Sequence, residues 1–310
     1  MAQDYNSIKN MKNLSTQNYW INIDKPYGYS SAKVVAIVKR ITKAKKVGHA
    51  GTLDPLASGV LPIAVNKATK TSDYIMKAEK KYYFEITWKE TRDTDDFEGK
   101  IIKTSNKTPK TSQIINILPY FMGKIAQIPS KFSAIRVNGK KSYELARQNK
   151  EFELQPREIQ IRQINLIFNN KQKAGFEVIC SKGTYIRSLN RDICERLGVC
   201  GYVSVLKRLK VGKFDIKNTI SLDKLKNIIN FSGVDDSIFN LRDVLDFMAE
   251  IALNDVLTFK IKNGQTIPIK SDLVANNQND LVKIINNDEI IGLGKIFDNN
   301  LKSVTIFNNQ

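Results

Sequence analysis

The feature that most constrains the fold of this 310-residue chain is a change of pattern near residue 250. Before it, strands and amphipathic helices are interspersed; after it, short strands are separated by glycine and asparagine turns, as in "NNDEIIGLGKIF". About 60 residues suffice for a small domain. We therefore predict an α+β domain over residues 18–245, a β-rich domain over 246–310, a boundary between Leu241 and Ile251, and a flexible tail over 1–17.

Local signals within the first domain predict individual elements. "YWINID" is typical of a strand, and Ser30 or Ser31 is expected to cap the helix that follows the Pro-Gly turn. Alternation predicts a strand over 81–88, and an apolar run predicts a buried strand over 60–65. Helices are predicted over 32–46, 68–80 and 111–125, and a strand, glycine turn and helix over 176–198, with Gly198 ending the helix. In the second domain, the segments 257–269, 280–297 and 302–307 are expected to be strands and turns.

Charge is the first functional clue. Lysine and arginine number 49 against 31 acidic residues, so the net charge is +18 and the pI is about 9.6. Such a field attracts polyanions, which leaves RNA, DNA or an anionic membrane surface as candidate partners, although compositional bias alone could also inflate lysine. The polar start carries no signal-peptide pattern, and no apolar run approaches the roughly 20 residues of a membrane helix.

Cysteine and histidine usage argues against a metal site or a disulfide framework. The chain has three cysteines (Cys180, Cys194 and Cys200) and one histidine, and their spacing matches no zinc motif. The acidic stretch "TRDTDDFEGK" fails the calcium-loop spacing because Phe97 stands where a ligand is needed. We therefore expect no metal, and a reducing, cytoplasmic location.

The stretch "GHAGTLDPLASG", residues 48–59, holds the only histidine, His49, and an aspartate, Asp54, directly before a proline. Pro55 biases Asp54 towards an extended backbone, and the flanking glycines permit close approach of a ligand. By residue type alone, the favoured interpretation is an ordinary Asp-Pro turn in which Asp54 bonds its own backbone. A catalytic carboxylate is the alternative.

Residues 131–150 combine cations with aromatic rings. Lys131, Arg136, Lys140, Lys141 and Arg147 are candidate RNA contacts, interleaved with Phe132 and Tyr143. Cations suit phosphates and rings suit bases, so the pattern favours a flexible RNA about as much as it favours a solvated hairpin and helix face.

The stretch "CSKGTYIRSL" places Tyr185 and Arg187 in the first turn of a helix after a glycine turn. An arginine here could pair with a carboxylate from elsewhere in the chain and keep it ionised. The alternative is a surface arginine that pairs along its own helix.

Six blocks occur in one order: "DKPYGYSS", "GHAGTLDPLASGVLPIAVNKATK", "KKYYFEI", "IPSKFSAIRVNGKKSYELAR", "CSKGTYIRSL" and "VLKRLKVGKF". Together, over roughly residues 18–220, the chain closely resembles the TruB-type tRNA pseudouridine synthases. The resemblance implies a mixed-sheet pseudouridine synthase catalytic domain with a basic RNA clamp near 125–152, and no metal or organic cofactor. The last segment resembles, more weakly, the small PUA-type RNA-binding domain.

The family's activity implies an isomerase that converts uridine 55, in the T-loop of tRNA, to pseudouridine by base flipping. The T-arm stem-loop would be the partner, with no membrane, no protein partner and a monomeric state expected. A role in assisting tRNA folding is compatible with catalysis, and a non-catalytic RNA-binding tRNA chaperone is the alternative function.

The resemblance also assigns roles to individual residues. Asp54 matches the catalytic aspartate, Tyr82 the tyrosine that stacks on the target base, and Arg187 the arginine that pairs with the aspartate. Tyr185 and Leu206 match further positions of the uridine pocket, and His49 matches the histidine that helps hold the flipped nucleotide. Lys25 matches a lysine of the first block, with a structural role or a role in supporting the active-site loop.

The residue types agree with that chemistry. Cleaving a glycosidic bond without a metal calls for one carboxylate near the sugar, which either attacks C1′ or removes a proton from C2′ to give a glycal. The sequence leaves both routes open. A tyrosine such as Tyr82 is a candidate base or relay for the C5 proton, and apolar side chains such as Leu206 would exclude water.

Overall fold

The computed structural model describes residues 14–148, 150–231, 235–269 and 281–307. Most of the expected tail, residues 1–13, lies outside the described residues. Just after it, Leu14 is buried, and the Asn66 side chain donates hydrogen bonds to the carbonyls of Ser15 and Gln17 at 2.9 and 2.8 Å. The chain therefore joins the fold from Leu14 onward.

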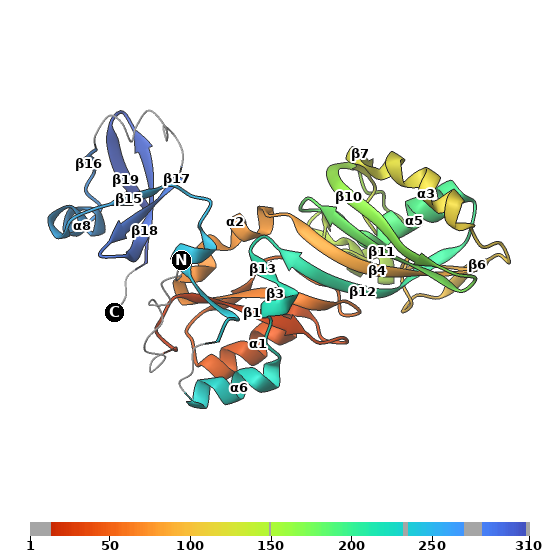
Figure 1. The fold of residues 1–310 in the computed structure, drawn as a ribbon, viewed down its shortest axis with the longest axis horizontal. Helices are drawn as coiled ribbons and strands as arrows, with labels where there is room; N and C mark the ends of the chain where they lie inside the picture. Colours follow the sequence, from red (N-terminus) through yellow and green to blue (C-terminus); the bar gives the residue numbers. More distant parts are fainter. Residues whose placement is uncertain (1–13, 149, 232–234, 270–280, 308–310) are drawn as a thin grey trace.

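A ten-stranded mixed sheet forms the larger part of the molecule (Figure 1). Its main path runs β14-β1-β3-β12-β4-β11-β10-β7, with β2 added to β3 and β13 to β12. The strands are β1 (Tyr19–Lys25), β2 (Val47–His49), β3 (Ser58–Val65), β4 (Lys80–Trp88), β7 (Gly123–Gln127), β10 (Arg157–Asn169), β11 (Lys173–Cys180), β12 (Gly201–Val211), β13 (Phe214–Asp215) and β14 (Ile238–Asn240). All their pairings are antiparallel except that of β3 with β12.

Helices cover the sheet, and two small hairpins project from it. The helical segments are α1 (Ser31–Thr42), η2 (Asn66–Thr71), α2 (Ser72–Lys77), α3 (Thr111–Ile117), η3 (Leu118–Phe121), α4 (Ser142–Arg147), α5 (Ile186–Leu197), η4 (Ile216–Asn218), α6 (Leu222–Phe231) and α7 (Leu241–Val244). The hairpins are β5 (Glu90–Arg92) with β6 (Ile101–Thr104), and β8 (Arg136–Val137) with β9 (Lys140–Lys141). Val34, Phe84 and Leu189 share the main core, so α1 and α5 lie on the same face of the sheet.

The second domain, at the upper left of Figure 1, has its own five-stranded sheet in the order β15-β17-β18-β19-β16. Its elements are β15 (Glu250–Ala252), α8 (Asp255–Lys262), β16 (Ile267–Pro268), β17 (Leu281–Asn286), β18 (Glu289–Phe297) and β19 (Asn300–Ile306). Ile261, Val282 and Ile284 belong to its separate core, whereas Leu293 and Phe307 pack with residues of the first domain. The predicted α+β class with a C-terminal β-rich domain is confirmed.

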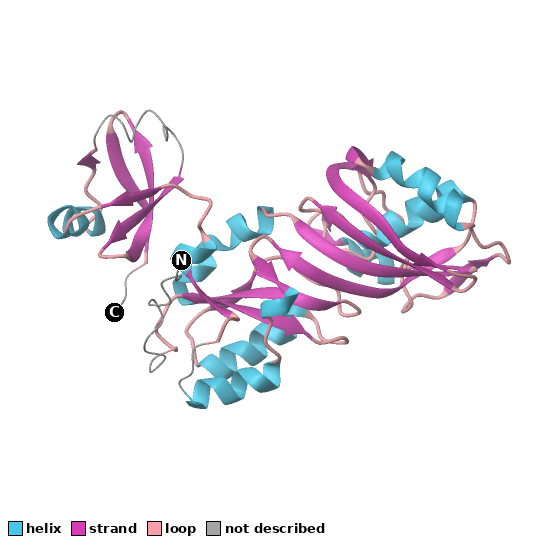
Figure 2. Cartoon of the chain, viewed as in Figure 1, coloured by secondary structure: helices cyan, strands magenta, loops and turns pink. Residues whose placement is uncertain are grey.

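Two local predictions are wrong. Residues 257–262, predicted as strand, form the end of α8, seen as a cyan helix in Figure 2. Asn254, just outside the apolar stretch, caps this helix by accepting a hydrogen bond from the Leu257 N–H at 2.9 Å. The helix predicted over 111–125 instead ends at Phe121, because Gly123 (φ +82°) turns the chain into β7.

Two other predicted helices have different bounds. The predicted helix 32–46 ends at Thr42, where Lys43 takes a left-handed conformation, and Ser30 is its N-cap. The segment predicted as helix 68–80 begins as the 3-10 segment η2 and ends at Lys77. Gly198 ends α5 in the left-handed conformation, as predicted.

The parallel contact between β3 and β12 is short and depends on Gly59. Its φ is +98°, and a Cβ there would lie 2.3 Å from the Arg208 carbonyl oxygen. Only Lys207–Ser58 and Arg208–Gly59 are paired, after which the two strands separate. The loop that carries Asp54 ends where β3 begins, at Ser58, the first residue of these two pairs.

Gly59→Ala should therefore lower the free energy of unfolding by more than the roughly 1–2 kcal/mol that a left-handed alanine costs, because β12 must also move. Urea denaturation measures this, with Gly198→Ala as control, since Gly198 is also left-handed but has open space around its Cβ position. Equal losses in the two variants would show that the close approach at Gly59 carries no cost of its own.

Candidate active site

Asp54 lies on the loop between β2 and β3, and Arg187 on the first turn of α5 binds its carboxylate. The Arg187 Nε and Nη2 atoms lie 3.0 and 2.8 Å from Asp54 Oδ2. Arg187 is 5% exposed, whereas the Asp54 side chain is 36% exposed. The arginine is thus buried behind a carboxylate that still reaches solvent. Two alternative interpretations are therefore wrong. The Asp54 carboxylate binds Arg187 and not its own backbone, and Arg187 pairs with Asp54 and not with a residue of its own helix.

Arg187 also holds two other loops. Its Nη1 atom lies 3.4 Å from Asp96 Oδ2 and donates to the Thr94 carbonyl at 3.2 Å and to Ser130 Oγ at 3.4 Å, while Nη2 donates to the Phe132 carbonyl at 2.9 Å. The acidic loop and the start of the basic segment therefore converge on the same guanidinium as Asp54. The acidic loop, rejected as a calcium site, serves here as a second counter-charge.

Residues at the end of β1 and at the start of α1 hold the loop around Asp54 in place by hydrogen bonds. The buried Lys25 Nζ donates to the carbonyls of Tyr29 and Pro55 at 2.6 and 3.2 Å. Ser31 Oγ is 2.9 Å from both the N–H and the carbonyl oxygen of Leu53. Burial lowers the pKa of Lys25 to about 8, although the nearby Asp54 charge opposes this shift. Lys25 therefore supports the active-site loop.

Arg208, on β12, is a site residue that sequence reasoning did not single out. It is fully buried, with Nε donating to the Val60 carbonyl at 2.7 Å and Nη2 to the Gly51 carbonyl at 3.1 Å. The β4–β12 register places it directly opposite Tyr82, and its positive charge acts to lower the pKa of that phenol. In the sequence, Arg208 is one of two adjacent basic residues in "VLKRLK", and nothing there distinguishes it from a surface cation. Its burial, which marks it as a site residue, is visible only in the structure.

The two tyrosines, Tyr82 and Tyr185, are both half-buried. Burial raises the pKa of Tyr82, and the Arg208 charge partly opposes the rise. Tyr185 caps α5, where its N–H donates to Gln127 Oε1 at 2.8 Å, and burial raises the pKa of its phenol as well. Both phenols are therefore neutral near pH 7.

His49 is half-buried at the end of β2. Burial and the nearby Arg208 charge lower its pKa, so the imidazole is neutral at pH 7. Its buried Nδ1 has no hydrogen-bond partner among the described residues. The neutral ring therefore carries a buried nitrogen whose hydrogen-bonding capacity is not used by the described residues.

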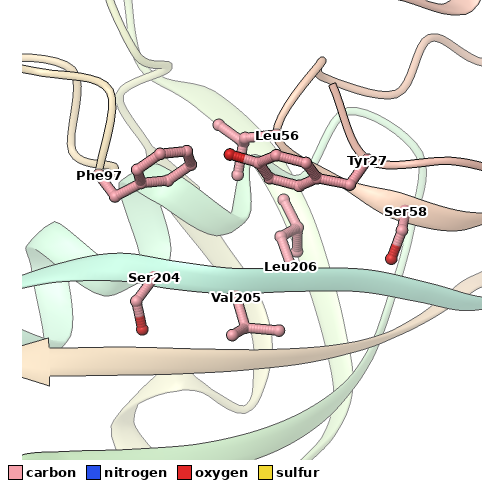
Figure 3. Close-up of a pocket in the computed structure, with 7 residues that line it drawn as sticks. All are labelled: Tyr27, Leu56, Ser58, Phe97, Ser204, Val205 and Leu206. Carbon is pink, nitrogen blue, oxygen red and sulfur yellow. The ribbon is translucent and has the colours of Figure 1, made fainter. Parts of the chain in front are cut away.

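A cavity of about 330 Å³ adjoins the Asp54 loop (Figure 3). Leu206, near the centre of Figure 3, contributes to its lining, whereas Asp54, Tyr82 and Tyr185 do not. The rings of Tyr27 and Phe97, with centroids 5.9 Å apart, face one another above Leu206. The remaining lining residues are Leu56, Ser58, Ser204 and Val205. The volume is at the lower end of small-molecule sites.

The basic segment begins where Arg187 holds Ser130 and Phe132 and continues through β8, β9 and α4. Lys131, Arg136, Lys140 and Arg147 are exposed, and Lys141 is half-buried. Lys141 and Arg147 lie over the Tyr143 ring at 5.5 and 5.7 Å, and Lys131 lies 6.0 Å from the Phe152 ring. Cations and rings are thus presented together beside the site.

The described residues contain no group of three His, Cys, Asp or Glu side chains that could hold a metal ion, and no described helix is long and apolar enough to cross a membrane. The cysteines Cys180, Cys194 and Cys200 are free and buried.

Similarity to known proteins covers nearly the whole chain. The TruB family pseudouridylate synthase N-terminal domain matches residues 39–186, and the tRNA pseudouridylate synthase B C-terminal domain matches 187–253. The tRNA pseudouridine synthase B of Ehrlichia ruminantium is 43% identical over 295 residues, which cover 93% of this chain and 99% of the relative. That of Bartonella bacilliformis is 38% identical, covering 93% and 95%.

The fold is shared with solved structures. The archaeal box H/ACA sRNP Nop10–Cbf5 complex matches with a TM-score of 0.70 at 23% identity, over 99% of this chain and 93% of the solved one. An H/ACA RNP bound to a substrate RNA containing 2′-deoxyuridine matches with a TM-score of 0.69 at 24% identity, over 94% and 85%.

The mixed sheet therefore has the same fold as the chain solved in the Nop10–Cbf5 complex. The chain belongs to the TruB family of pseudouridylate synthases, as its relatives at about 40% identity establish.

Asp95, beside the site, should make stability depend on pH. Burial raises its pKa to about 6, although Arg191 and Arg187 oppose the rise. Because the native carboxyl binds its proton more tightly than the unfolded one, this stability is present below about pH 4 and lost as the pH rises through 6. The raised pKa corresponds to about 3 kcal/mol at 1.36 kcal/mol per unit.

Asp95→Asn should remove the loss of stability between about pH 4 and about pH 6, because an amide does not titrate. Asparagine also tolerates the local φ of +62°. We expect the variant to gain up to about 3 kcal/mol over wild type at pH 7.5 and little at pH 4, measured by urea denaturation at both values. Asp298→Asn, an exposed site with φ +44°, is the control. Parallel pH curves for wild type and Asp95→Asn would contradict the prediction.

Proposed function

We propose that this protein isomerises uridine 55, in the T-loop of tRNA, to pseudouridine, with Asp54 as the catalytic carboxylate. The observation that carries the proposal is the exposed Asp54 carboxylate held by the buried Arg187 at the divergence of β3 and β12. Membership of the TruB family supports the reaction, and the names of relatives such as the Ehrlichia ruminantium protein support tRNA as the substrate.

The chemistry needs one carboxylate and no net exchange of atoms. The N1–C1′ bond breaks, either through attack of Asp54 on C1′ or through loss of a C2′ proton to Asp54. Uracil leaves with the bonding electrons, rotates and forms the C5–C1′ bond, while either the Asp54–C1′ bond breaks or Asp54 returns its proton to C2′. The C5 proton then moves to N1 by way of a base or solvent, and the Asp54 carboxylate is regenerated. Arg187 occupies Asp54 Oδ2, and Oδ1 accepts no hydrogen bond from the described residues, so it remains available to the sugar.

The surrounding residues take supporting roles. Tyr82 stacks on the flipped base and relays the C5 proton, and the Arg208 charge beside its hydroxyl stabilises the transient phenolate. Tyr185 and Leu206 supply walls that exclude water, and the neutral His49 holds the flipped nucleotide. No metal or organic cofactor enters these steps.

The RNA is gripped outside the pocket by the basic segment, whose Lys131, Arg136, Lys140, Lys141 and Arg147 meet phosphates. We assign the β-rich domain, residues 246–310, as a PUA-like RNA-binding domain. The protein acts as a monomer in the cytoplasm, on the T-arm stem-loop, and can also assist tRNA folding. A chaperone without catalysis is the competing function.

Asp54→Asn should lower the rate of pseudouridine formation by at least about 10³-fold while leaving tRNA affinity within about threefold of wild type, because the amide can neither attack nor accept the proton. Mass mapping of tRNA transcripts and filter binding measure the two effects. Asp73→Asn, an exposed acid on α2, is the matched control. Wild-type activity in Asp54→Asn would contradict the role of Asp54 as the catalytic carboxylate. Absence of pseudouridine formation by the wild-type protein would favour the non-catalytic tRNA chaperone.

Reversal of Lys140 and Lys141 to glutamate should weaken tRNA binding and flatten the plot of log affinity against log salt by about one unit for each phosphate that is no longer neutralised. The measurement is a salt titration of binding. Lys100 and Lys103, exposed at the β5–β6 hairpin, carry the same charge change as a control. A slope that matches the control would assign β8 and β9 a structural role only.

A further inference from the structure

The segment from residue 25 to residue 72 is the most one-sided in charge near the site. It carries nine lysines and arginines against a single acidic residue, Asp54. Six exposed cations gather where α1 ends and η2 follows β3: Lys39, Arg40, Lys43, Lys45, Lys46 and Lys70. We call these six the α1-end patch. None of the six forms an ion pair with the residues that the structure describes.

The backbone that presents the patch is held in place. The Asn66 side chain accepts hydrogen bonds from the N–H groups of Lys45 and Lys46 at 3.1 and 3.4 Å, and the Asn66 N–H donates to the Lys46 carbonyl at 2.7 Å. Lys43 ends α1 in the left-handed conformation. The cations therefore project from a fixed turn, which reduces the entropy lost on binding.

Stabilisation of α1 does not account for the patch. Cations in the last turn of a helix interact favourably with its dipole, and this covers Lys39 and Arg40. Lys45, Lys46 and Lys70 lie outside the helix, where that effect fades. Unpaired like charges repel one another and destabilise the folded state, so their concentration here indicates an anionic partner.

The position of the patch favours nucleic acid over a membrane. β2 leads directly from Lys46 to His49, and at about 3.3 Å per residue Lys46 lies about 10 Å from His49 and Lys43 no more than about 20 Å. Among the described residues, the exposed large apolar side chains nearest to these cations in sequence are Tyr27 and Met76, so the segment lacks the apolar face of a membrane-surface helix.

We propose that the α1-end patch binds the phosphates of the helical RNA next to the target loop, as a second grip on tRNA separate from the 131–150 segment. This rests on the proposed function. A separation of about 10–20 Å from His49 corresponds to roughly 3 to 6 base-pair steps of about 3.4 Å, so a stem longer than about three base pairs is needed to reach it. Phosphate contacts of this kind position a duplex without reading its sequence.

The test compares two RNAs and two triple variants. The RNAs are a full-length tRNA transcript and a minimal hairpin that keeps the same loop on two G–C pairs. The variants are Lys43/Lys45/Lys46→Gln and the control Lys100/Lys103/Lys107→Gln. The control removes three exposed lysines from around the β5–β6 hairpin, whose strand β6 lies at the right of Figure 1, away from α1. Both change the net charge by the same amount, so long-range attraction falls equally.

We expect the patch variant to bind tRNA about tenfold or more weakly than the control, and to flatten the salt dependence by about one unit for each phosphate that the patch no longer binds. Affinity for the minimal hairpin, and pseudouridine formation in it at saturation, should match the control. Equal tRNA affinity and slope in the two variants, or equal losses on both RNAs, would overturn the proposal. Unchanged tRNA binding together with abolished binding to phosphatidylserine vesicles would assign the patch to lipid instead.

The experiment distinguishes failure of the proposed function from failure of the patch proposal. If the wild-type protein forms no pseudouridine in either RNA, catalysis is refuted whatever the binding data show, and the patch is judged from affinity and salt slope alone.

Discussion

The ion pair between Arg187 and Asp54 is the interaction on which the rest of the site depends. A guanidinium cannot lose its charge, so a buried arginine needs both a counter-charge and hydrogen-bond acceptors for its donors. Asp54 and Asp96 supply the charge, and Thr94, Ser130 and Phe132 supply further acceptors. Because these partners come from three loops, satisfying one side chain fixes the relative positions of all three. Loss of Arg187 would leave Asp96 buried beside fewer cations and release the loops together.

The divergence of β3 and β12 creates the space in which this pair works. The strands touch for two residue pairs, with Gly59 at the point of closest approach, and the Arg208 side chain then binds the backbone at Gly51 and Val60. Arg208 thereby replaces strand–strand hydrogen bonds that separation of the strands leaves unmade. The same side chain reaches Tyr82, so the wall of the site and its candidate proton relay share one support.

Local rules predicted the elements where the deciding residues stood close together. The Ser30 cap, the end of α5 at Gly198 and the alternating β4 follow from neighbouring residues. α8 was missed because its cap, Asn254, precedes the apolar pattern, and β7 because Gly123 outweighs an apparently helical stretch. The Asp54–Arg187 pairing came from family resemblance, since composition cannot join residues that far apart. Arg208 and the Tyr27–Phe97 pair were missed because burial and facing rings are properties of the folded chain.

The long separation within the ion pair has a consequence for synthesis. Asp54 and Arg187 are 133 residues apart, so a ribosome adding about 5–20 residues per second makes the aspartate about 7 to 27 seconds before its arginine. The interval between synthesis of β1 and synthesis of β14, its partner at the edge of the sheet, is longer still. A nascent chain can thus present its basic N-terminal half well before the catalytic centre is complete. Because Arg187 holds the Asp54 carboxylate, the candidate site can be assembled only after both residues have been synthesised.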